Sequence, residues 1–231
     1  MIPLRDANPT RRTPVVTIGL LALCTAVFAL ELGVLATDGQ AGFEDLVNRY
    51  GLVPDAFLTA IGRDQWLSIP VLAMFTSMFL HGGWLHLLGN MLYLWIFGNN
   101  VEDRMGRLRF LVFYLLGGVA AGLAQTAVDP GSAVPMVGAS GAISAALGAY
   151  LVLFPRARIQ SLVFLGFFYQ LIAVPSVIVL GFWFLLQLVD GIGALGAATA
   201  DGGVAIWAHI GGFVAGMVMA LPFRLRSPRV G

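Results

Sequence analysis

Lysine is absent from this 231-residue chain, and charged residues of all kinds make up only 11% of it. Soluble globular proteins carry about 25% charged residues, so this share excludes an ordinary water-soluble surface. The single cysteine, Cys24, excludes an internal disulfide framework and predicts a free thiol inside an apolar run. Hydrophobic residues make up 58% of the chain, and the mean hydropathy is +0.87. The composition therefore predicts a polytopic membrane protein.

Uncharged stretches recur along the chain at about the 20-residue length that crosses a bilayer as a helix. Backbone polar groups in lipid must be satisfied within their own segment, so we expect helices. Six are predicted: Pro14–Ala36, Trp84–Gly98, Leu108–Val128, Ser140–Phe154, one inside Ile159–Val189, and Val204–Phe223. We predict an all-α polytopic membrane protein, a six-transmembrane-helix bundle with a long outer first loop. Its membrane domain covers residues 14–223, between a cytoplasmic N-terminal segment (1–13) and a cytoplasmic C-terminal tail (224–231).

The arginines are distributed unevenly over this six-span arrangement. Only Arg49 and Arg63 fall on one side. The other side has Arg5, Arg11, Arg12, Arg104, Arg107, Arg109, Arg156, Arg158, Arg224, Arg226 and Arg229. Because arginine and lysine concentrate in cytoplasmic loops, both termini are predicted to be cytoplasmic. The membrane is expected to be a bacterial inner membrane.

Two regions fit the six-span scheme less simply, and a third is expected to move. The outer loop 37–83 is too polar at its start to span, and we expect its end to lie in the interface or dip into the bilayer. The stretch 159–189 is longer than one span needs, so part of it is expected along the cytoplasmic surface, with Pro175 interrupting it. The loop from Asp190 to Gly203 is rich in glycine and alanine and is predicted to be mobile.

Four polar residues fall within or at the ends of predicted spans, where polar groups are costly and mark function by default: His86, Asn90, Ser140 and His209. Their depth follows from a helical rise of about 1.5 Å per residue, counted from the cytoplasmic arginine that ends each segment. Ser140 lies roughly 24 Å from that arginine, His209 roughly 22 Å, Asn90 roughly 21 Å and His86 roughly 27 Å. Three spans thus place a polar group at nearly one level, in the outer half of the bilayer.

Helical periodicity assigns these groups to faces. His86 and Asn90 are four residues apart and share one face. Two further stripes contain small residues: Ser140, Ser144 and Gly148 in the fourth span, and His209, Gly212 and Gly216 in the sixth. Small residues at such spacing let membrane helices approach closely. If the two spans pack along these stripes, Ser140 and His209 face each other at hydrogen-bonding range.

This arrangement suits nucleophilic catalysis. A serine hydroxyl becomes a nucleophile when an adjacent base takes its proton, and the His209 imidazole is a suitable base. Ser140 begins a helix, so its own N–H is free for an oxyanion, to which His86 and Asn90 would add donors. Gly138 and Gly141 would let the backbone turn and a substrate carbonyl approach. With no acidic residue expected near this level, we predict a Ser140–His209 dyad without a third carboxylate.

Several motifs together resemble those of the rhomboid family of intramembrane serine proteases. They are HGGWLHLLGN (81–90), VEDRMG (101–106), GASG (138–141) and AHIGGFVAG (208–216), with YGLVPDAF (50–57) similar to the first loop of many bacterial members. The resemblance covers roughly residues 70–223 and implies that Ser140 is the nucleophile, His209 the general base, and His86 and Asn90 the oxyanion-stabilising pair. Glu102 and Arg104 match a structural E-x-R motif. The family cleaves transmembrane segments of other membrane proteins near the outer face and uses no metal or cofactor.

The chain departs from the family pattern at two places. A Trp-Arg pair often found in the first loop is not evident near Asp64–Ser68. In some members an aromatic residue four positions after the nucleophile stacks on the histidine, but this position is Ser144 here. His209 is therefore expected to be held in another way.

Other interpretations of single residues remain open. Ser140 alone would suit helix packing, His209 a core histidine, and Asn90 an interhelical hydrogen bond. Glu102 and Arg104 would also suit a solvated ion pair. His81 lies five residues from His86, about 140° around a helix, which argues against a shared metal site and favours a structural hydrogen bond.

Two other functions compete with proteolysis. One is an inactive relative that binds and escorts transmembrane segments, which would be expected to lack the serine or histidine. The other is a transporter that relays protons through histidines, but the two halves show no internal repeat. We expect transmembrane protein substrates and the lipid bilayer as partners, and no nucleic acid. The sequence does not specify an oligomeric state.

Overall fold

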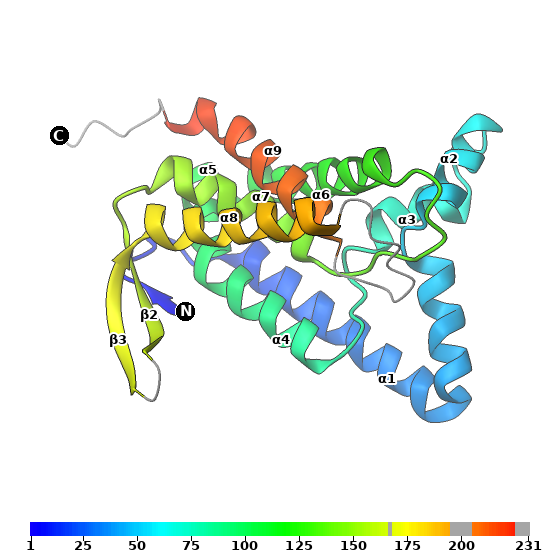
Figure 1. Ribbon diagram of the computed structural model, residues 1–231, viewed down its shortest axis with the longest axis horizontal. Coiled ribbons are helices and arrows are strands. Elements are labelled where there is room, and N and C mark those ends of the chain that lie inside the picture. The colour runs from blue at the N-terminus through cyan, green and yellow to red at the C-terminus, as the bar shows by residue number, and fades with distance from the viewer. Residues whose placement is uncertain (166–167, 195–204, 225–231) are drawn as a thin grey trace.

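The computed structural model describes residues 1–165, 168–194 and 205–224, most of them in helices (Figure 1). The elements in chain order are β1 (Ile2–Asp6), α1 (Val15–Tyr50), α2 (Pro54–Gly62), α3 (Ile69–Thr76), α4 (Trp84–Tyr93), the π-helix η1 (Leu94–Gly98), α5 (Asn99–Met105), α6 (Arg107–Val128), α7 (Ser140–Leu153), β2 (Arg158–Leu165), β3 (Phe168–Pro175), α8 (Ser176–Ala194) and α9 (Ile206–Arg224). Helices α6, α7 and α9 pack against one another at the centre. Most of the predicted C-terminal tail, 225–231, lies outside the described residues.

Within the described residues, four helices are long and apolar enough to cross a membrane: α1, α6, α8 and α9. Helices α4, η1 and α5 follow one another without a break from Trp84 to Met105 and form a further helical rod. Large apolar side chains cover the outside of the molecule. Leu30, Leu85 and Leu108, for example, are 70%, 88% and 74% exposed. Apolar surfaces of this extent suit contact with lipid rather than water.

The central helix α7 is unusually short for a membrane protein. Its 14 residues span roughly 21 Å, less than the roughly 30 Å of a bilayer's hydrocarbon core. Every residue from Ala142 to Tyr150 is buried. Its C-terminal end leads toward β2 and the arginine-bearing end of the molecule. Ser140, at its N-terminus, therefore lies within the bundle.

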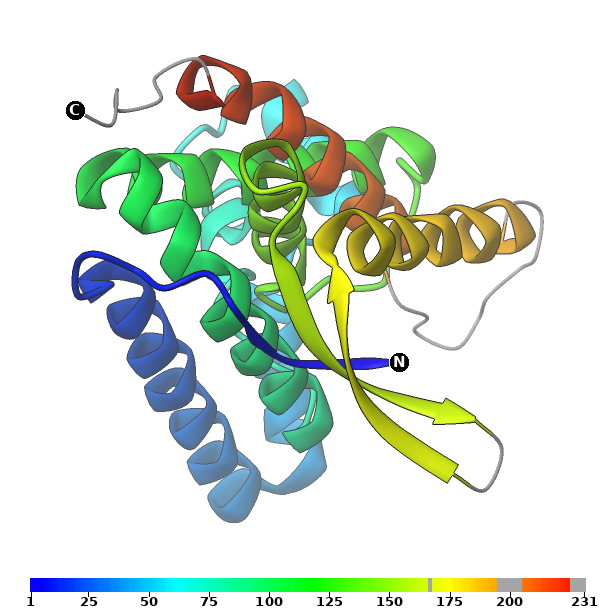
Figure 2. The ribbon, with the colours of Figure 1, turned by 90° about the vertical axis from the view of Figure 1, so that its left-hand side faces the viewer.

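The prediction of an all-α protein is wrong at the end of the molecule that carries the N-terminal segment and most of the arginines. An antiparallel sheet with the strand order β1-β2-β3 is present there (Figure 2). Ile2 pairs with Leu162, and Arg158 with Pro175. The stretch 159–189 therefore divides at Pro175, where the strands end and α8 begins. Proline suits this boundary because it has no N–H for either a ladder or a helix interior.

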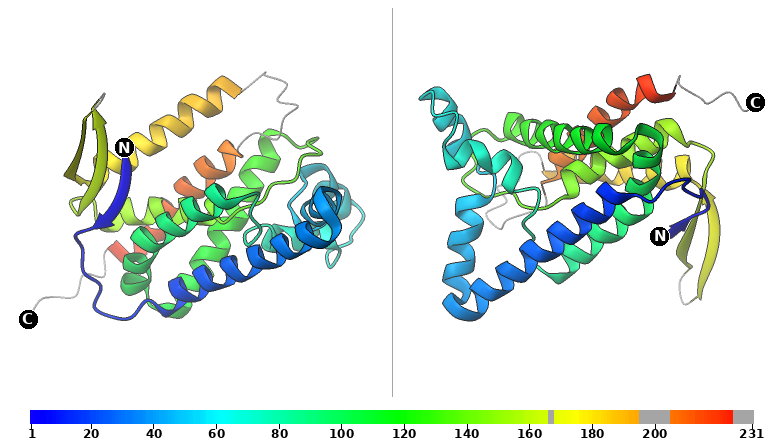
Figure 3. Two further views of the ribbon diagram at one scale, coloured as in Figure 1. Left: turned by 90° about the horizontal axis from the view of Figure 1, so that it is seen from below. Right: turned by 180° about the vertical axis from the view of Figure 1, so that it is seen from behind.

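The region expected as a long outer loop, 37–83, contains considerable helix. Helix α1 does not end at Ala36 but continues to Tyr50, with a break at Gly39, whose φ of 69° and ψ of −165° are not helical. Figure 3 shows the resulting change of direction along α1. Leu52, Phe57 and Met74 form a small separate core among α2, α3 and the chain before them. The predicted mobile loop from Asp190 begins as the last turn of α8, and residues 195–204 lie outside the described residues.

Helix α1 is anchored by a buried carboxylate. Glu102, only 2% exposed, accepts hydrogen bonds from the backbone N–H groups of Val16 and Thr17, at 3.0 and 2.7 Å, and from the Thr17 hydroxyl at 2.8 Å. A negative charge there satisfies free N–H groups of the first turn and complements the helix dipole. Arg104 instead donates to the carbonyl of Phe223, at 3.0 Å from Nη2. The alternative of a solvated Glu102–Arg104 pair is therefore wrong.

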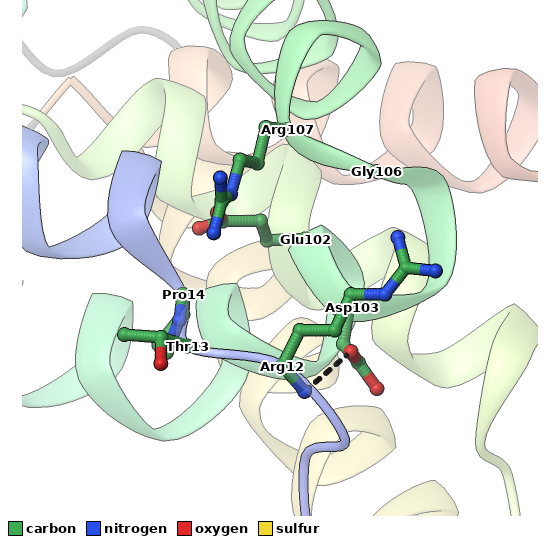
Figure 4. A pocket seen from close by; sticks show the side chains of 7 residues that line it. All are labelled: Arg12, Thr13, Pro14, Glu102, Asp103, Gly106 and Arg107. Carbon is green, nitrogen blue, oxygen red and sulfur yellow. Dashed lines mark hydrogen bonds between the residues drawn. The ribbon is translucent and has the colours of Figure 1, made fainter.

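Hydrogen bonds to Asp6 hold the N-terminal segment at the same end of the molecule. The Asp6 carboxylate accepts from Asn100 Nδ2 at 2.6 Å and from the Tyr150 hydroxyl at 2.9 Å. Burial raises the pKa of Asp6, and the hydrogen bond from Tyr150 acts in the opposite direction. A nearby pocket has a volume of about 280 Å³. Figure 4 shows the residues that line it: Arg12, Thr13, Pro14, Glu102, Asp103, Gly106 and Arg107. This pocket lies at the end of the bundle where α9 finishes, away from Ser140.

Candidate active site

The hydroxyl of Ser140 and the ring of His209 are in direct contact. Ser140 is the first residue of α7, and His209 lies in the first turn of α9. His209 Nε2 is 2.8 Å from Ser140 Oγ, which is hydrogen-bonding distance. Both residues are half-buried. The two polar groups expected at one depth on separate spans therefore form one site.

Glycine backbone contacts bring α7 and α9 together. A Cβ atom at Gly212 would meet the carbonyl oxygen of Gly141, one at Gly216 would meet that of Ala145, and one at Gly148 would meet that of Phe213. These neighbours are backbone atoms, which cannot rotate away as a flexible side chain can. Ser144 lies on the same side of α7, and its hydroxyl donates to the Ser140 carbonyl at 2.7 Å. The distance between Ser140 and His209 therefore depends on these glycines.

The segment before Ser140 brings Gly138 against the second span. Gly138 has a φ of +125°, and its N–H donates to the carbonyl of Ser77 at 2.8 Å. A Cβ at this position would be 2.5 Å from His86 Nε2. Glycine is therefore required for two reasons, the backbone conformation and the space for the imidazole. Gly141 faces α6 instead, where a Cβ would be 2.7 Å from the Ala121 Cβ.

His86 and Asn90 present nitrogen atoms next to Gly138. His86 Nδ1 accepts a long hydrogen bond, 3.4 Å, from the Gly82 N–H. Since Nδ1 accepts, a neutral His86 carries its proton on Nε2, the atom that faces Gly138. Asn90 Nδ2, 3.6 Å from the position of a Cβ on Gly138, is buried and has no hydrogen-bond partner among the described residues. Two donors are thus available beside the start of α7.

Two residues that sequence reasoning missed contact His209 from α8. Gln187 Oε1 lies 2.7 Å from His209 Nδ1, and the Trp183 ring centroid lies 6.0 Å from that of His209. Their spacing of four residues puts both on one face of α8. A glutamine inside an apolar span is itself a signal, because polar side chains are costly at that depth. These two side chains hold the histidine in the absence of an aromatic residue at Ser144.

A third missed residue is Glu31, a buried carboxylate in α1. It is 1% exposed and accepts the His81 N–H at 3.0 Å. His81 Nδ1 lies 3.1 Å from the Phe79 carbonyl, and its ring centroid is 5.3 Å from that of His86. The prediction that His81 and His86 would not share a face is therefore wrong, because α4 begins only at Trp84 and His81 is not helical. No group of three or more metal-binding side chains occurs within the part of the chain that the structure describes.

Comparison with known proteins identifies the family of the chain. The Rhomboid domain model matches residues 68–226, which is more than half of the chain. The chain belongs to the rhomboid family. It is 36% identical over 162 residues, 70% of its length, to Rhomboid protease GluP of Bacillus subtilis. It is also 36% identical over 78 residues to Putative rhomboid protease YdcA of the same species, and 34% identical over 148 residues to Rhomboid-like protease 5 of Toxoplasma gondii.

These matches cover only parts of the relatives. The matched regions amount to 28% of the GluP length, 39% of YdcA and 15% of the Toxoplasma protein. Of this chain, the matches to YdcA and the Toxoplasma protein cover 34% and 62%. Membership of the rhomboid family, together with the four long apolar helices, makes this an integral membrane protein.

Proposed function

We propose that this rhomboid-family protein is an intramembrane serine endopeptidase that hydrolyses peptide bonds in or near transmembrane segments of other membrane proteins. Ser140 is the nucleophile and His209 the general base. The observation that carries the proposal is the 2.8 Å contact between His209 Nε2 and Ser140 Oγ. Relatives named as proteases support the same reaction class. No metal or cofactor is needed for this chemistry.

The reaction proceeds by acyl transfer. Ser140 Oγ attacks the carbonyl carbon of the substrate while His209 Nε2 takes the hydroxyl proton. The C–N bond then breaks, and His209 returns the proton to the leaving amine. Water then attacks the carbonyl carbon of the acyl-enzyme and gives a proton to His209. The bond between that carbon and Ser140 Oγ breaks, His209 returns the proton to Oγ, and the carboxylic acid leaves. Ser140 and His209 thus handle every proton transfer between them.

The oxyanion that forms during attack is stabilised by three donors: the Ser140 N–H, His86 and Asn90. The Ser140 N–H is free because it lies at the beginning of α7. The hydrogen bond to His86 Nδ1 leaves the Nε2 proton facing Gly138, beside the nucleophile. The buried, unpartnered Asn90 Nδ2 is a donor that substrate would satisfy. Donors arranged before the reaction avoid reorganisation in the transition state.

The proposal includes the arrangement in the membrane. Six spans, formed by α1, α4-η1-α5, α6, α7, α8 and α9, make the protease domain of residues 14–223. The segments 1–13 and 224–231 flank it in the cytoplasm of a bacterial cell, and the site opens toward the outer face of the inner membrane. Asp6 accepts hydrogen bonds from Asn100 and Tyr150, so the N-terminal segment lies at the same end of the molecule as these two residues. Most arginines belong to that end, which supports a cytoplasmic N-terminus.

A fluorophosphonate probe tests the proposed chemistry directly. Ser140 Oγ would bond to phosphorus, fluoride would leave, and His209 would take the hydroxyl proton. We expect the purified protein in detergent to be labelled at Ser140, as located by peptide mass spectrometry, and the His209→Ala variant to remain unlabelled. Absence of label from the folded wild-type protein would instead favour a relative that binds transmembrane segments without cleaving them.

Asn90→Ala is expected to slow cleavage of a model transmembrane substrate by roughly ten- to a thousand-fold, the range for one oxyanion donor. The loss should appear in kcat, because the donor is needed in the transition state. Thr126→Val is the matched control, since Thr126 Oγ1 is also buried without a partner among the described residues but belongs to α6. Full activity of Asn90→Ala would remove Asn90 from the oxyanion site.

A further inference from the structure

His209 is held at both ring nitrogens by residues from two other helices. Nε2 contacts Ser140 Oγ of α7 at 2.8 Å, and Nδ1 contacts Gln187 Oε1 of α8 at 2.7 Å. Gln187 is half-buried, and Trp183, one turn earlier on α8, lies beside the same ring. The general base therefore has a neighbour in the position that a carboxylate occupies in a three-residue catalytic triad.

The chemical identity of the contacting atoms determines where the imidazole proton lies. An amide oxygen only accepts hydrogen bonds, so Nδ1 must donate to it. A neutral imidazole with its proton on Nδ1 has a lone pair on Nε2, and that lone pair faces the Ser140 hydroxyl. The opposite tautomer would place a proton between Nε2 and Ser140 Oγ, and His209 could not then accept the serine proton. The acceptor at Nδ1 thus selects the tautomer that can act as a base.

We propose that Gln187 is a positioning residue that fixes the tautomer and the ring orientation of His209. This inference rests on the proposed function and adds a third member to the Ser140–His209 pair. Gln187 neither takes the proton nor touches the substrate. A neutral amide also suits the location, because a carboxylate among these membrane helices would have to be desolvated. The same bond ties the base on α9 to α8.

The rate of fluorophosphonate labelling in Gln187 variants is the main test. This small probe measures activation of Ser140 without requiring a transmembrane substrate to bind. Gln187→Met keeps a similar volume but has no oxygen acceptor, and we expect labelling to slow by about 10- to 100-fold, corresponding to roughly 1.4–2.8 kcal/mol. Gln187→Glu retains an acceptor oxygen and should restore labelling to within about tenfold of wild type. Leu186→Met is the matched control, because Leu186 is an exposed neighbour on α8.

A spectroscopic measurement separates positioning from simple helix packing. The chain has only three histidines, so ¹⁵N-histidine labelling gives few ring signals, and the His209→Ala variant identifies those of His209. The wild-type ring should carry its proton on Nδ1, whereas Gln187→Met should show a mixture of tautomers.

Three results would overturn the inference: wild-type labelling in Gln187→Met, equal losses in the Met and Glu variants, or an unchanged tautomer. Each leaves the proposed function intact as long as wild-type Ser140 is still labelled. If wild-type Ser140 is not labelled at all, the proposed function itself fails.

Discussion

Replacing Ser140 by alanine is expected to reduce cleavage of a transmembrane substrate by at least roughly a thousand-fold, because serine proteases lose activity on that scale when the catalytic nucleophile is removed. The substitution removes one oxygen atom and the only hydroxyl that contacts His209 Nε2 among the described residues. The backbone N–H of residue 140, His86 and Asn90 all remain, so binding should change little and the loss should fall on kcat. Cleavage is measured on gels with a purified single-span substrate.

Ser144→Ala supplies the matched control for this prediction. Ser144 lies one turn further along α7, and among the described residues its hydroxyl bonds only to a carbonyl of its own helix. Such a bond contributes about 1 kcal/mol, so this variant should lose less than roughly tenfold in rate. His209→Ala should match Ser140→Ala, because the two residues act as a unit. Cleavage that persists in Ser140→Ala would assign the reaction to another nucleophile.

The sequence predicts the central part of the fold well because a bilayer imposes strict rules on it. Helices must satisfy their own backbone groups, and close helix contacts need small residues. Counting along helices was therefore enough to expect Ser140 and His209 on facing spans, and the structure has their side-chain atoms 2.8 Å apart. The expected free, buried thiol of Cys24 is also present. The catalytic roles themselves remain predictions.

The sheet could not be predicted from hydropathy. Residues 159–175 carry no charge, so they look like part of a membrane span. They nevertheless form β2 and β3, which pair with each other, and β2 also pairs with β1, more than 150 positions earlier in the chain. Pairing over such a distance leaves no local periodic signal that distinguishes an apolar strand from an apolar helix. The prediction of an all-α protein is wrong for these strands, whereas most of the described residues are helical as expected.

Gln187 and Glu31 were missed for different reasons. The depth of a residue is counted from an arginine at the end of its segment, and α8 has none, so the sequence assigns Gln187 to no level. Glu31 was detectable, because an acidic residue inside an apolar run is costly unless it has a partner. Its partner is a backbone N–H of His81, 50 positions away, and no side-chain pattern identifies such a contact.

Gly216→Ala is expected to cause the largest loss of stability among single substitutions of the α7–α9 contact. The added Cβ would overlap the carbonyl group and Cα of Ala145, which are backbone atoms that cannot move without displacing α7. Overpacking of this kind costs about 1–3 kcal/mol. Because Gly216 and His209 lie on the same face of α9, separation of the helices would also move Nε2 away from Ser140 Oγ. The variant should therefore unfold at a lower temperature in detergent and label more slowly with the fluorophosphonate.

Gly19→Ala on α1 isolates the effect of the contact from that of losing a glycine. A Cβ at Gly19 would meet nothing within 4 Å, so the same substitution there should be neutral or slightly stabilising. Both variants are compared by thermal unfolding and by labelling rate in the same detergent. If Gly216→Ala behaves like Gly19→Ala in both measurements, close backbone contact does not set the distance between Ser140 and His209. A loss confined to Gly216→Ala would tie catalysis to the absence of side chains at one helix crossing.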